Sequence, residues 1–126
     1  MSVESRGAGL RLVIVDDNRH FLRAACNLLE QDGVDVVGVA STSAATVQLA
    51  VELRPDVILV DVDLGGESGF DLAQRLAVYP ARVVLISAYP ESELADLIAT
   101  TPAVGFVSKS ELSASAVTNL LGNNVR

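Results

Sequence analysis

Five runs of aliphatic residues recur along the chain at nearly even spacing. They begin near Arg11, Val34, Val57, Arg82 and Val104, at intervals of 23, 23, 25 and 22 residues. Each interval has room for one strand, one helix of about three turns and two short loops. Because the runs have no sequence motif in common beyond their aliphatic residues, the spacing predicts alternating strands and helices rather than a solenoid repeat.

The segments between the runs carry apolar residues at helical spacing. Residues 21–29 place five apolar side chains on one helix face. Pro55, Pro80 and Pro102 limit the next three helices, and Gly122 is expected just past the end of the last one. Strict alternation of strand and helix predicts parallel strands joined by right-handed crossovers.

The composition of the runs separates central strands from edge strands. Residues 12–15, 57–60 and 83–86 are unbroken aliphatic segments, as expected for strands covered by helices on both faces. The second run contains Gly38 and the fifth contains Gly105, which suits edge strands. The sequence therefore predicts an α/β fold: a flavodoxin-like, doubly wound, five-stranded parallel sheet of order 2-1-3-4-5, with helices on both faces.

A chain of 126 residues is long enough for one domain with one core. We expect this domain at residues 10–122, with a flexible tail at 1–9 and a tail or the start of a linker at 123–126. No stretch reaches the roughly 18 apolar residues of a membrane span, and the N-terminal residues lack the apolar region of a signal peptide. These features predict a cytoplasmic protein without a membrane partner.

The charge and the rare residue types exclude several kinds of function. Nine basic against 16 acidic residues give a net charge of −7, which repels phosphate backbones, so we expect no nucleic acid to bind this chain alone. The single cysteine, Cys26, excludes an intramolecular disulfide and a cysteine-based zinc site. The single histidine, His20, leaves no spare candidate for a Ser/His/Asp catalytic set.

Polar side chains follow four of the five runs. They are Asp16 and Asp17 after the first run, Asp61 and Asp63 after the third, Ser87 after the fourth and Lys109 after the fifth. Each alone has an ordinary explanation as a helix cap, a turn residue or a solvated lysine. Since the carboxyl ends of parallel strands meet at one edge, their joint placement favours a shared site.

Carboxylates crowded at one edge repel each other unless a cation lies between them. Hard oxygen ligands of this kind suit Mg²⁺, which keeps several waters in proteins. A magnesium ion, a lysine and a hydroxyl together would stabilise a transferring phosphoryl group. A neighbouring carboxylate could then act as the nucleophile and become an acyl phosphate.

Four segments together resemble the receiver domains of two-component response regulators, over about residues 10–121. They are VIVDDN (13–18), PDVILVDVDLGGESG (55–69), VVLISA (83–88) and GFVSKS (105–110). The pairing of Lys109 with Ser110 is similar to the group that carries helix-turn-helix DNA-binding outputs. Control of transcription would then need a DNA-binding domain outside this chain.

The resemblance implies that Asp61 is the phosphoacceptor and receives a phosphoryl group from a histidine kinase or a phosphotransfer protein. Asp17 and Asp61 would ligate Mg²⁺ through carboxylates, Asp63 through its backbone carbonyl and Asp16 through water. Such a protein is a signalling phosphoacceptor that catalyses only its own phosphotransfer and dephosphorylation, and is otherwise no enzyme.

The resemblance also implies a conformational switch. Lys109 would pair with the phosphoryl oxygens, Ser87 would move to hydrogen-bond them, and Phe106 would turn inward behind Ser87. Tyr89 and Asp63 would tune the rate of dephosphorylation. The fourth helix, fifth strand and fifth helix would form the changing surface, through which a homodimer could form.

Three positions depart from the family pattern, and one of them is Phe106, which lacks the hydroxyl of a tyrosine. Gly65 and Ser110 each stand where a proline is usual. A glycine should leave the loop after Asp61 freer. A cis peptide before a residue other than proline costs about 3 kcal/mol, so we expect the peptide before Ser110 to be trans.

Two alternatives stay open at this stage. Asp61-Val62-Asp63 also resembles the Asp-x-Asp nucleophile and acid of haloacid-dehalogenase-type phosphatases. That motif normally opens its chain, the chain is short for a cap domain, and Asp16 and Asp17 would be unexplained. A degenerate receiver that only binds partners is the other alternative, and the full set of acids with Ser87 and Lys109 argues against it.

Overall fold

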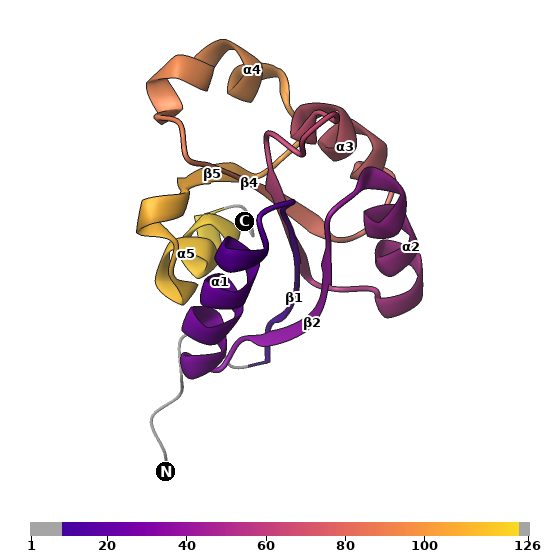
Figure 1. Cartoon of the computed structure of the whole chain (residues 1–126), viewed down its shortest axis with the longest axis vertical. Helices are drawn as coiled ribbons and strands as arrows, with labels where there is room; N and C mark the ends of the chain where they lie inside the picture. The colour runs from indigo at the N-terminus through magenta and orange to yellow at the C-terminus, as the bar shows by residue number, and fades with distance from the viewer. Residues whose placement is uncertain (1–8, 124–126) are drawn as a thin grey trace.

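The chain folds around a five-stranded parallel sheet in a computed structural model that describes residues 9–123 (Figure 1). The strands are β1 (Arg11–Val15), β2 (Asp35–Ala40), β3 (Val57–Asp61), β4 (Arg82–Ser87) and β5 (Gly105–Ser108). Their order is β2-β1-β3-β4-β5 and every pair is parallel, which confirms the predicted topology. Apart from Gly9 and Asn123, the predicted tails lie outside the described residues.

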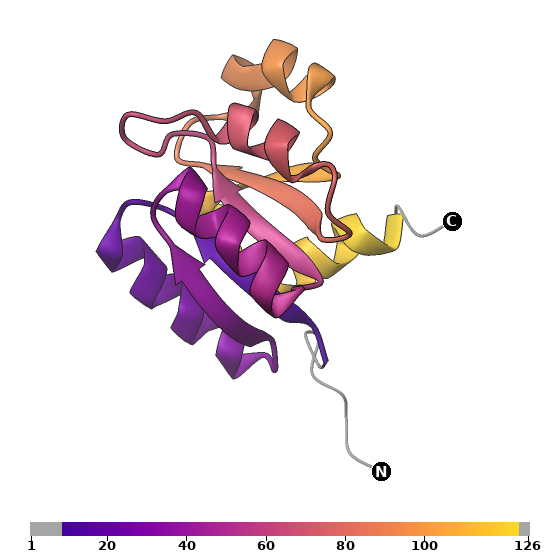
Figure 2. The ribbon, with the colours of Figure 1, turned by 90° about the vertical axis from the view of Figure 1, so that its right-hand side faces the viewer.

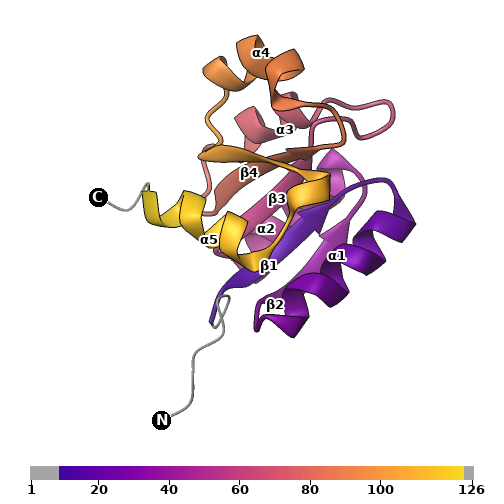
Figure 3. The ribbon, with the colours of Figure 1, turned by 90° about the vertical axis from the view of Figure 1, so that its left-hand side faces the viewer.

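Helices cover both faces of the sheet, as predicted. They are α1 (Arg19–Gln31), α2 (Ser43–Leu53), α3 (Gly69–Leu76), α4 (Ala95–Thr100) and α5 (Ala114–Asn123), with short 3₁₀ turns η1 (Glu91–Leu94) and η2 (Lys109–Glu111). Helices α2, α3 and α4 are on the face turned toward the viewer in Figure 2. Helices α1 and α5 lie on the opposite face (Figure 3). None of the helices within residues 9–123 has the length and hydropathy needed to cross a bilayer.

The alternation of side chains along each strand builds one core layer on each face of the sheet. In β1, Leu12 and Ile14 pack with α1 and α5, whereas Val13 and Val15 pack with α2 and α3. All four side chains are fully buried. A strand covered on both faces has no polar side, which explains why the central runs are unbroken aliphatic segments.

Short polar residues set where the helices begin. Asn18, Thr42 and Ser68 cap α1, α2 and α3 by accepting a hydrogen bond from a backbone N–H in the first turn. The expected end of the last helix is wrong by two residues. Gly122 lies inside α5, which continues to Asn123, and its φ is not positive, so it does not form the left-handed turn that ends a helix.

Candidate functional site

The carboxyl ends of β1, β3 and β5 bring Asp16, Asp61 and Lys109 together. The Nζ atom of Lys109 lies 2.6 Å from Oδ2 of Asp16 and 3.1 Å from Oδ2 of Asp61. Asp16 is fully buried and Asp61 is 5 % exposed. Asp17 is exposed and adds a third carboxylate, since single oxygens of Asp16, Asp17 and Asp61 all lie within 4.8 Å of one another. We call these three residues the acidic cluster.

Each buried carboxylate of the acidic cluster uses one oxygen to order the chain that follows it. Oδ1 of Asp16 accepts a hydrogen bond from the Asn18 N–H at 2.9 Å, and Oδ1 of Asp61 accepts one from the Asp63 N–H at 3.1 Å. Oδ2 of Asp16 has no hydrogen-bond partner in the described part of the chain. That oxygen instead makes a short ion pair with Lys109. The three carboxylates of the acidic cluster, with ligand oxygens within 4.8 Å of one another, are the donor type that suits a hard cation.

Burial dominates the electrostatics of Asp61. Removal from water raises the pKa of Asp61 to about 6, and the charge of Asp16 adds to the rise. The Asp63 N–H and Lys109 oppose the rise by stabilising the carboxylate. Burial lowers the pKa of Lys109, but its contacts with Asp16 and Asp61 outweigh burial and raise that pKa above its ordinary value. Lys109 therefore stays charged at neutral pH.

Phe21 is a part of the site that sequence reasoning missed. Nζ of Lys109 lies 4.5 Å from the centre of the Phe21 ring, close enough for a cation–π contact. The sequence places Phe21 on the apolar face of the first helix, and nothing in its local pattern points to the lysine 88 residues further along the chain.

Of the predicted switch residues, Ser87 is the last residue of β4 and Phe106 is the second residue of β5. Ser87 is buried, and its Oγ accepts a hydrogen bond from the Tyr89 N–H at 2.9 Å. Phe106 in β5 is half-buried against the core layer on the α3 side. The Tyr89 side chain is 54 % exposed. Ser87 therefore lies at the same end of the sheet as the acidic cluster, while the movement predicted for Ser87 and Phe106 stays a prediction.

The side chain of Asp63 is hydrogen-bonded within the loop between β3 and α3. Its Oδ1 accepts a hydrogen bond from the Gly65 N–H at 3.1 Å. Gly65 has φ +74°, and a Cβ there would lie 3.1 Å from Oδ2 of Asp17. A proline has neither this φ nor the N–H, so the glycine found in place of the usual proline has a structural reason.

The other end of this loop depends on a second glycine. A Cβ at Gly69 would come within 2.0 Å of the Asp61 carbonyl oxygen and 2.7 Å of the Val62 Cα. The start of α3 therefore passes directly over the residue that follows β3. Ser110 also stands where the family usually has a proline. The peptide before it is trans, as expected, and residues 9–123 contain no cis peptide bond.

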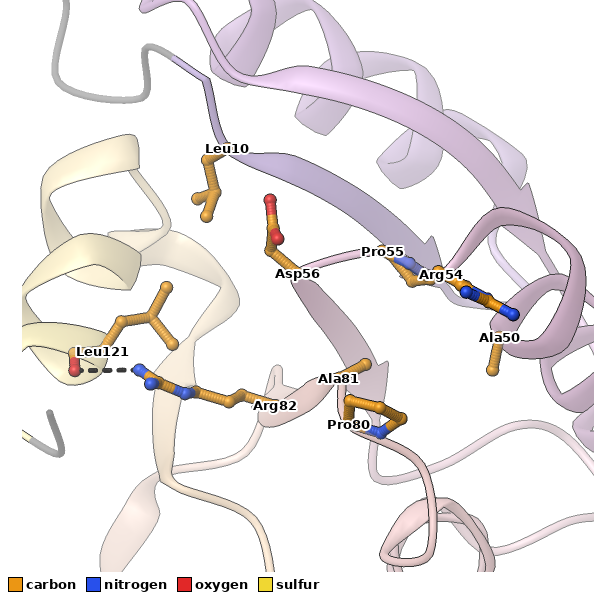
Figure 4. A pocket seen from close by; sticks show the side chains of 9 residues that line it. All are labelled: Leu10, Ala50, Arg54, Pro55, Asp56, Pro80, Ala81, Arg82 and Leu121. Atoms are coloured by element: carbon orange, nitrogen blue, oxygen red, sulfur yellow. Dashed lines mark hydrogen bonds between the residues drawn. The ribbon is translucent and has the colours of Figure 1, made fainter.

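A hollow of about 430 Å³ opens beside Asp16 and Asp17. It lies between α1 and the connection from β2 to α2, and Arg19, Leu22 and Val39 also line it. A second cavity of about 500 Å³ lies at the opposite edge of the sheet, where the strands begin (Figure 4). Asp16 and Asp17 of the acidic cluster line the first hollow, whereas Asp61 and Lys109 do not line either cavity.

Comparisons with known proteins agree with this geometry. Residues 12–120 match the sequence model of the response regulator receiver domain. The DNA-binding transcriptional activator EvgA of Escherichia coli is 28 % identical over 104 residues, which cover 81 % of this chain and 51 % of EvgA. A protein-glutamate methylesterase/protein-glutamine glutaminase of Geobacter sulfurreducens is 30 % identical over 102 residues, or 79 % of this chain and 28 % of that protein. This chain thus spans about half the length of EvgA and about a quarter of the esterase.

A solved structure gives the same result. The signal receiver domain of a response regulator, NarL of Mycobacterium tuberculosis, superposes with a TM-score of 0.81 at 28 % identity, covering 93 % of this chain and 98 % of that one. None of these matches supports the phosphatase alternative.

Proposed function

The chain belongs to the response regulator receiver family, and from this premise we propose that Asp61 accepts a phosphoryl group from a histidine kinase or a phosphotransfer protein. One observation carries the proposal: the buried Asp61 carboxylate lies in an acidic cluster with Lys109 at 3.1 Å. An oxygen of the Asp61 carboxylate would attack phosphorus while the P–N bond to the donor imidazole breaks. The imidazole nitrogen then takes up a proton, and Asp61 becomes an acyl phosphate.

The acidic cluster fits a magnesium ion, which Asp16, Asp17 and Asp61 would hold with the backbone carbonyl of Asp63. The closeness of the three carboxylates supports this assignment. When bound, the ion would offset the surplus negative charge and stabilise charge on the phosphoryl oxygens.

Lys109 supplies a positive charge next to Asp61, with its Nζ 3.1 Å from Oδ2 of Asp61. Contact with Asp16 orients the ammonium, and the Phe21 ring lies over it. A pKa of about 6 leaves Asp61 mostly ionised at neutral pH, and the ionised form is the nucleophile. Once Asp61 is phosphorylated, its phosphoryl oxygens become the nearest anionic partners for Lys109.

Phosphorylation would shift a conformational equilibrium at β4 and β5. Ser87 would exchange its contact with the Tyr89 N–H for one with the phosphoryl group, and Phe106 would move inward behind it. Asp63 and Tyr89 would tune the loss of phosphate. The surface formed by α4, β5 and α5 would then bind a second copy or an output partner.

The proposal extends to the role of the protein in the cell. The chain would act in the cytosol as a signalling phosphoacceptor and not as an enzyme on other substrates. Because EvgA is a DNA-binding transcriptional activator, control of transcription through a DNA-binding domain is the output that we propose.

Incubation with a small phosphodonor tests the phosphoacceptor assignment. With Mg²⁺ and acetyl phosphate, we expect the intact mass to rise by one phosphoryl group, and we expect no gain for Asp61→Asn. Asp71→Asn is the matched control, since Asp71 is an exposed carboxylate in the first turn of α3. Equal labelling of wild type and Asp61→Asn would remove Asp61 from this role.

A further inference from the structure

The loop between β3 and α3 has an anchor on a different helix. The carboxylate of Glu67 accepts a hydrogen bond from the Ser43 N–H at 2.8 Å, between Oε1 and the first residue of α2. The two residues are 24 positions apart in the sequence. Figure 2 shows this loop extending beside the start of α2. The contact fixes the far side of the loop to a rigid element.

The contact suits both partners chemically. The first N–H groups of a helix have no partner inside the helix, and in α2 the capping residue Thr42 receives the N–H of Ala45 instead. The first turn of α2 carries no acidic residue of its own. Glu67 therefore supplies from another element the negative charge that a helix N-terminus favours.

The anchor lies opposite the acidic cluster within a short loop. On one side, the Gly65 backbone lies against Asp17, where an added Cβ would be 3.1 Å from Oδ2. Across the loop, the Leu64 N–H donates a hydrogen bond to the Glu67 carbonyl at 3.0 Å, which ties the two sides together. The loop closes where the Gly69 N–H donates to the Val62 carbonyl at 2.9 Å. A displacement of Glu67 is thereby passed to the backbone of residues 63–65.

We propose that Glu67 is a positioning residue for the cation site: by binding the Ser43 N–H it holds residues 63–65 in place against Asp17. Without the proline usual in this loop, Gly65-Gly66 gives the loop no stiffness of its own. The bond to α2 provides that stiffness from outside. This inference rests on the proposed function, because it assumes that the acidic cluster binds Mg²⁺.

Two variants break the contact from opposite sides. Glu67→Ala removes the acceptor. Ser43→Pro removes the donor and leaves Glu67 intact, and proline is favoured at the first position of a helix. Thr42, which precedes this position, has the extended backbone that a following proline requires, with φ −135° and ψ 162°. Glu67→Gln keeps an acceptor oxygen without the charge, and Glu52→Ala removes an exposed carboxylate from α2 as the control.

Calorimetric titration of the full chain with Mg²⁺ measures the effect. We expect Glu67→Ala and Ser43→Pro each to weaken binding about tenfold, as loss of a supporting contact around a metal site does. The double variant should bind no more weakly than either single one, because both remove the same contact. Glu67→Gln and Glu52→Ala should bind as the wild type does. Melting curves without Mg²⁺ identify any variant that fails to fold, and Glu67→Ala carries the test if Ser43→Pro does not fold.

Three results would overturn the inference. Wild-type affinity in Glu67→Ala would show that the anchor does not reach the cation site. Equal weakening in Glu67→Gln and Glu67→Ala would show that the carboxylate acts on the ion through its charge and not by positioning the loop. A wild-type chain that binds no Mg²⁺ would defeat the proposed cation site itself, whereas the first two results leave that site standing.

Discussion

The two ends of the parallel sheet both carry charged side chains, but they use them differently. At the amino ends of the strands, the Arg11 N–H binds Asp56 and the Arg11 side chain binds the Arg54 carbonyl. The Arg82 side chain binds the Leu121 carbonyl (Figure 4). At the carboxyl ends, Asp16 and Asp61 are buried and share Lys109.

The difference lies in burial and charge balance, not in the presence of charge. Asp56 and Arg54 at the amino ends are exposed, so water screens them and each contributes little to folding. At the carboxyl ends, Asp16, Asp17 and Asp61 crowd around a buried edge with Lys109 in contact. Like charges crowded at a buried site lower the stability of the metal-free fold. Such an arrangement therefore indicates a binding site for a cation.

The largest effect should come from a side chain at Gly69. Gly69→Ala would force the Asp61 carbonyl away from the start of α3, and we expect the free energy of unfolding to fall by about 4 kcal/mol or more. Gly66→Ala is the matched control in the same loop, because nothing lies within 4 Å of its added Cβ. Urea denaturation measures the free energy of unfolding of both variants. Equal values would mean that the backbone around Gly69 at the carboxyl end of the sheet is not closely packed.

Replacement of one positively charged side chain at each end of the sheet compares the two ends directly. Lys109→Met leaves Asp16 and Asp61 buried without their counter-charge, which should cost about 3 kcal/mol at pH 7. Arg82→Met loses one bond to a backbone carbonyl and should cost about 1 kcal/mol. The same denaturation assay measures both variants. If Arg82→Met were the more damaging, the contrast between the ends would be wrong.

The raised pKa of Asp61 gives the metal-free chain a specific pH dependence. Since the folded form binds this proton near pH 6 and the unfolded form near pH 4, the free energy of unfolding should fall as pH rises between these values. The fall should be on the order of 2 kcal/mol. Asp61→Asn should remove this fall in the free energy of unfolding, whereas Asp56→Asn at the other end of the sheet should retain it. An unchanged slope in Asp61→Asn would assign the effect elsewhere.

Stabilisation by Mg²⁺ is expected to be smaller than the effects of Gly69→Ala, Lys109→Met and the titration of Asp61. At ten times its dissociation constant the ion should add about 1.4 kcal/mol, or a rise in melting temperature of about 4 °C. Asp17→Asn should abolish this rise and stabilise the metal-free form by relieving repulsion. Asp56→Asn should leave the rise intact. A melting temperature that is the same with and without Mg²⁺ would count against the cation site.

The strand order and the edge that holds the site could be predicted because they follow from local signals. Unbroken aliphatic runs mark β1, β3 and β4 as central, and acids directly after β1 and β3 must meet at one edge. Simple periodicity carries this information, since it depends only on which side chains are apolar.

Contacts made by loops and helix surfaces could not be predicted in this way. Phe21 reaches Lys109 and Glu67 reaches Ser43 only because the folded chain brings distant segments together. A glutamate in a loop and a phenylalanine on a helix have the same local pattern with or without such partners. Similarly, the positive φ of Gly65 follows from the path of the loop around Asp17.

The site of phosphoryl attachment tests the central claim most directly. After reaction with acetyl phosphate and Mg²⁺, borohydride reduction converts an aspartyl phosphate to homoserine, which peptide mass mapping can locate. The account predicts homoserine at position 61 and at no other aspartate. Homoserine at Asp16, Asp17 or Asp63 with Asp61 unmodified would contradict it.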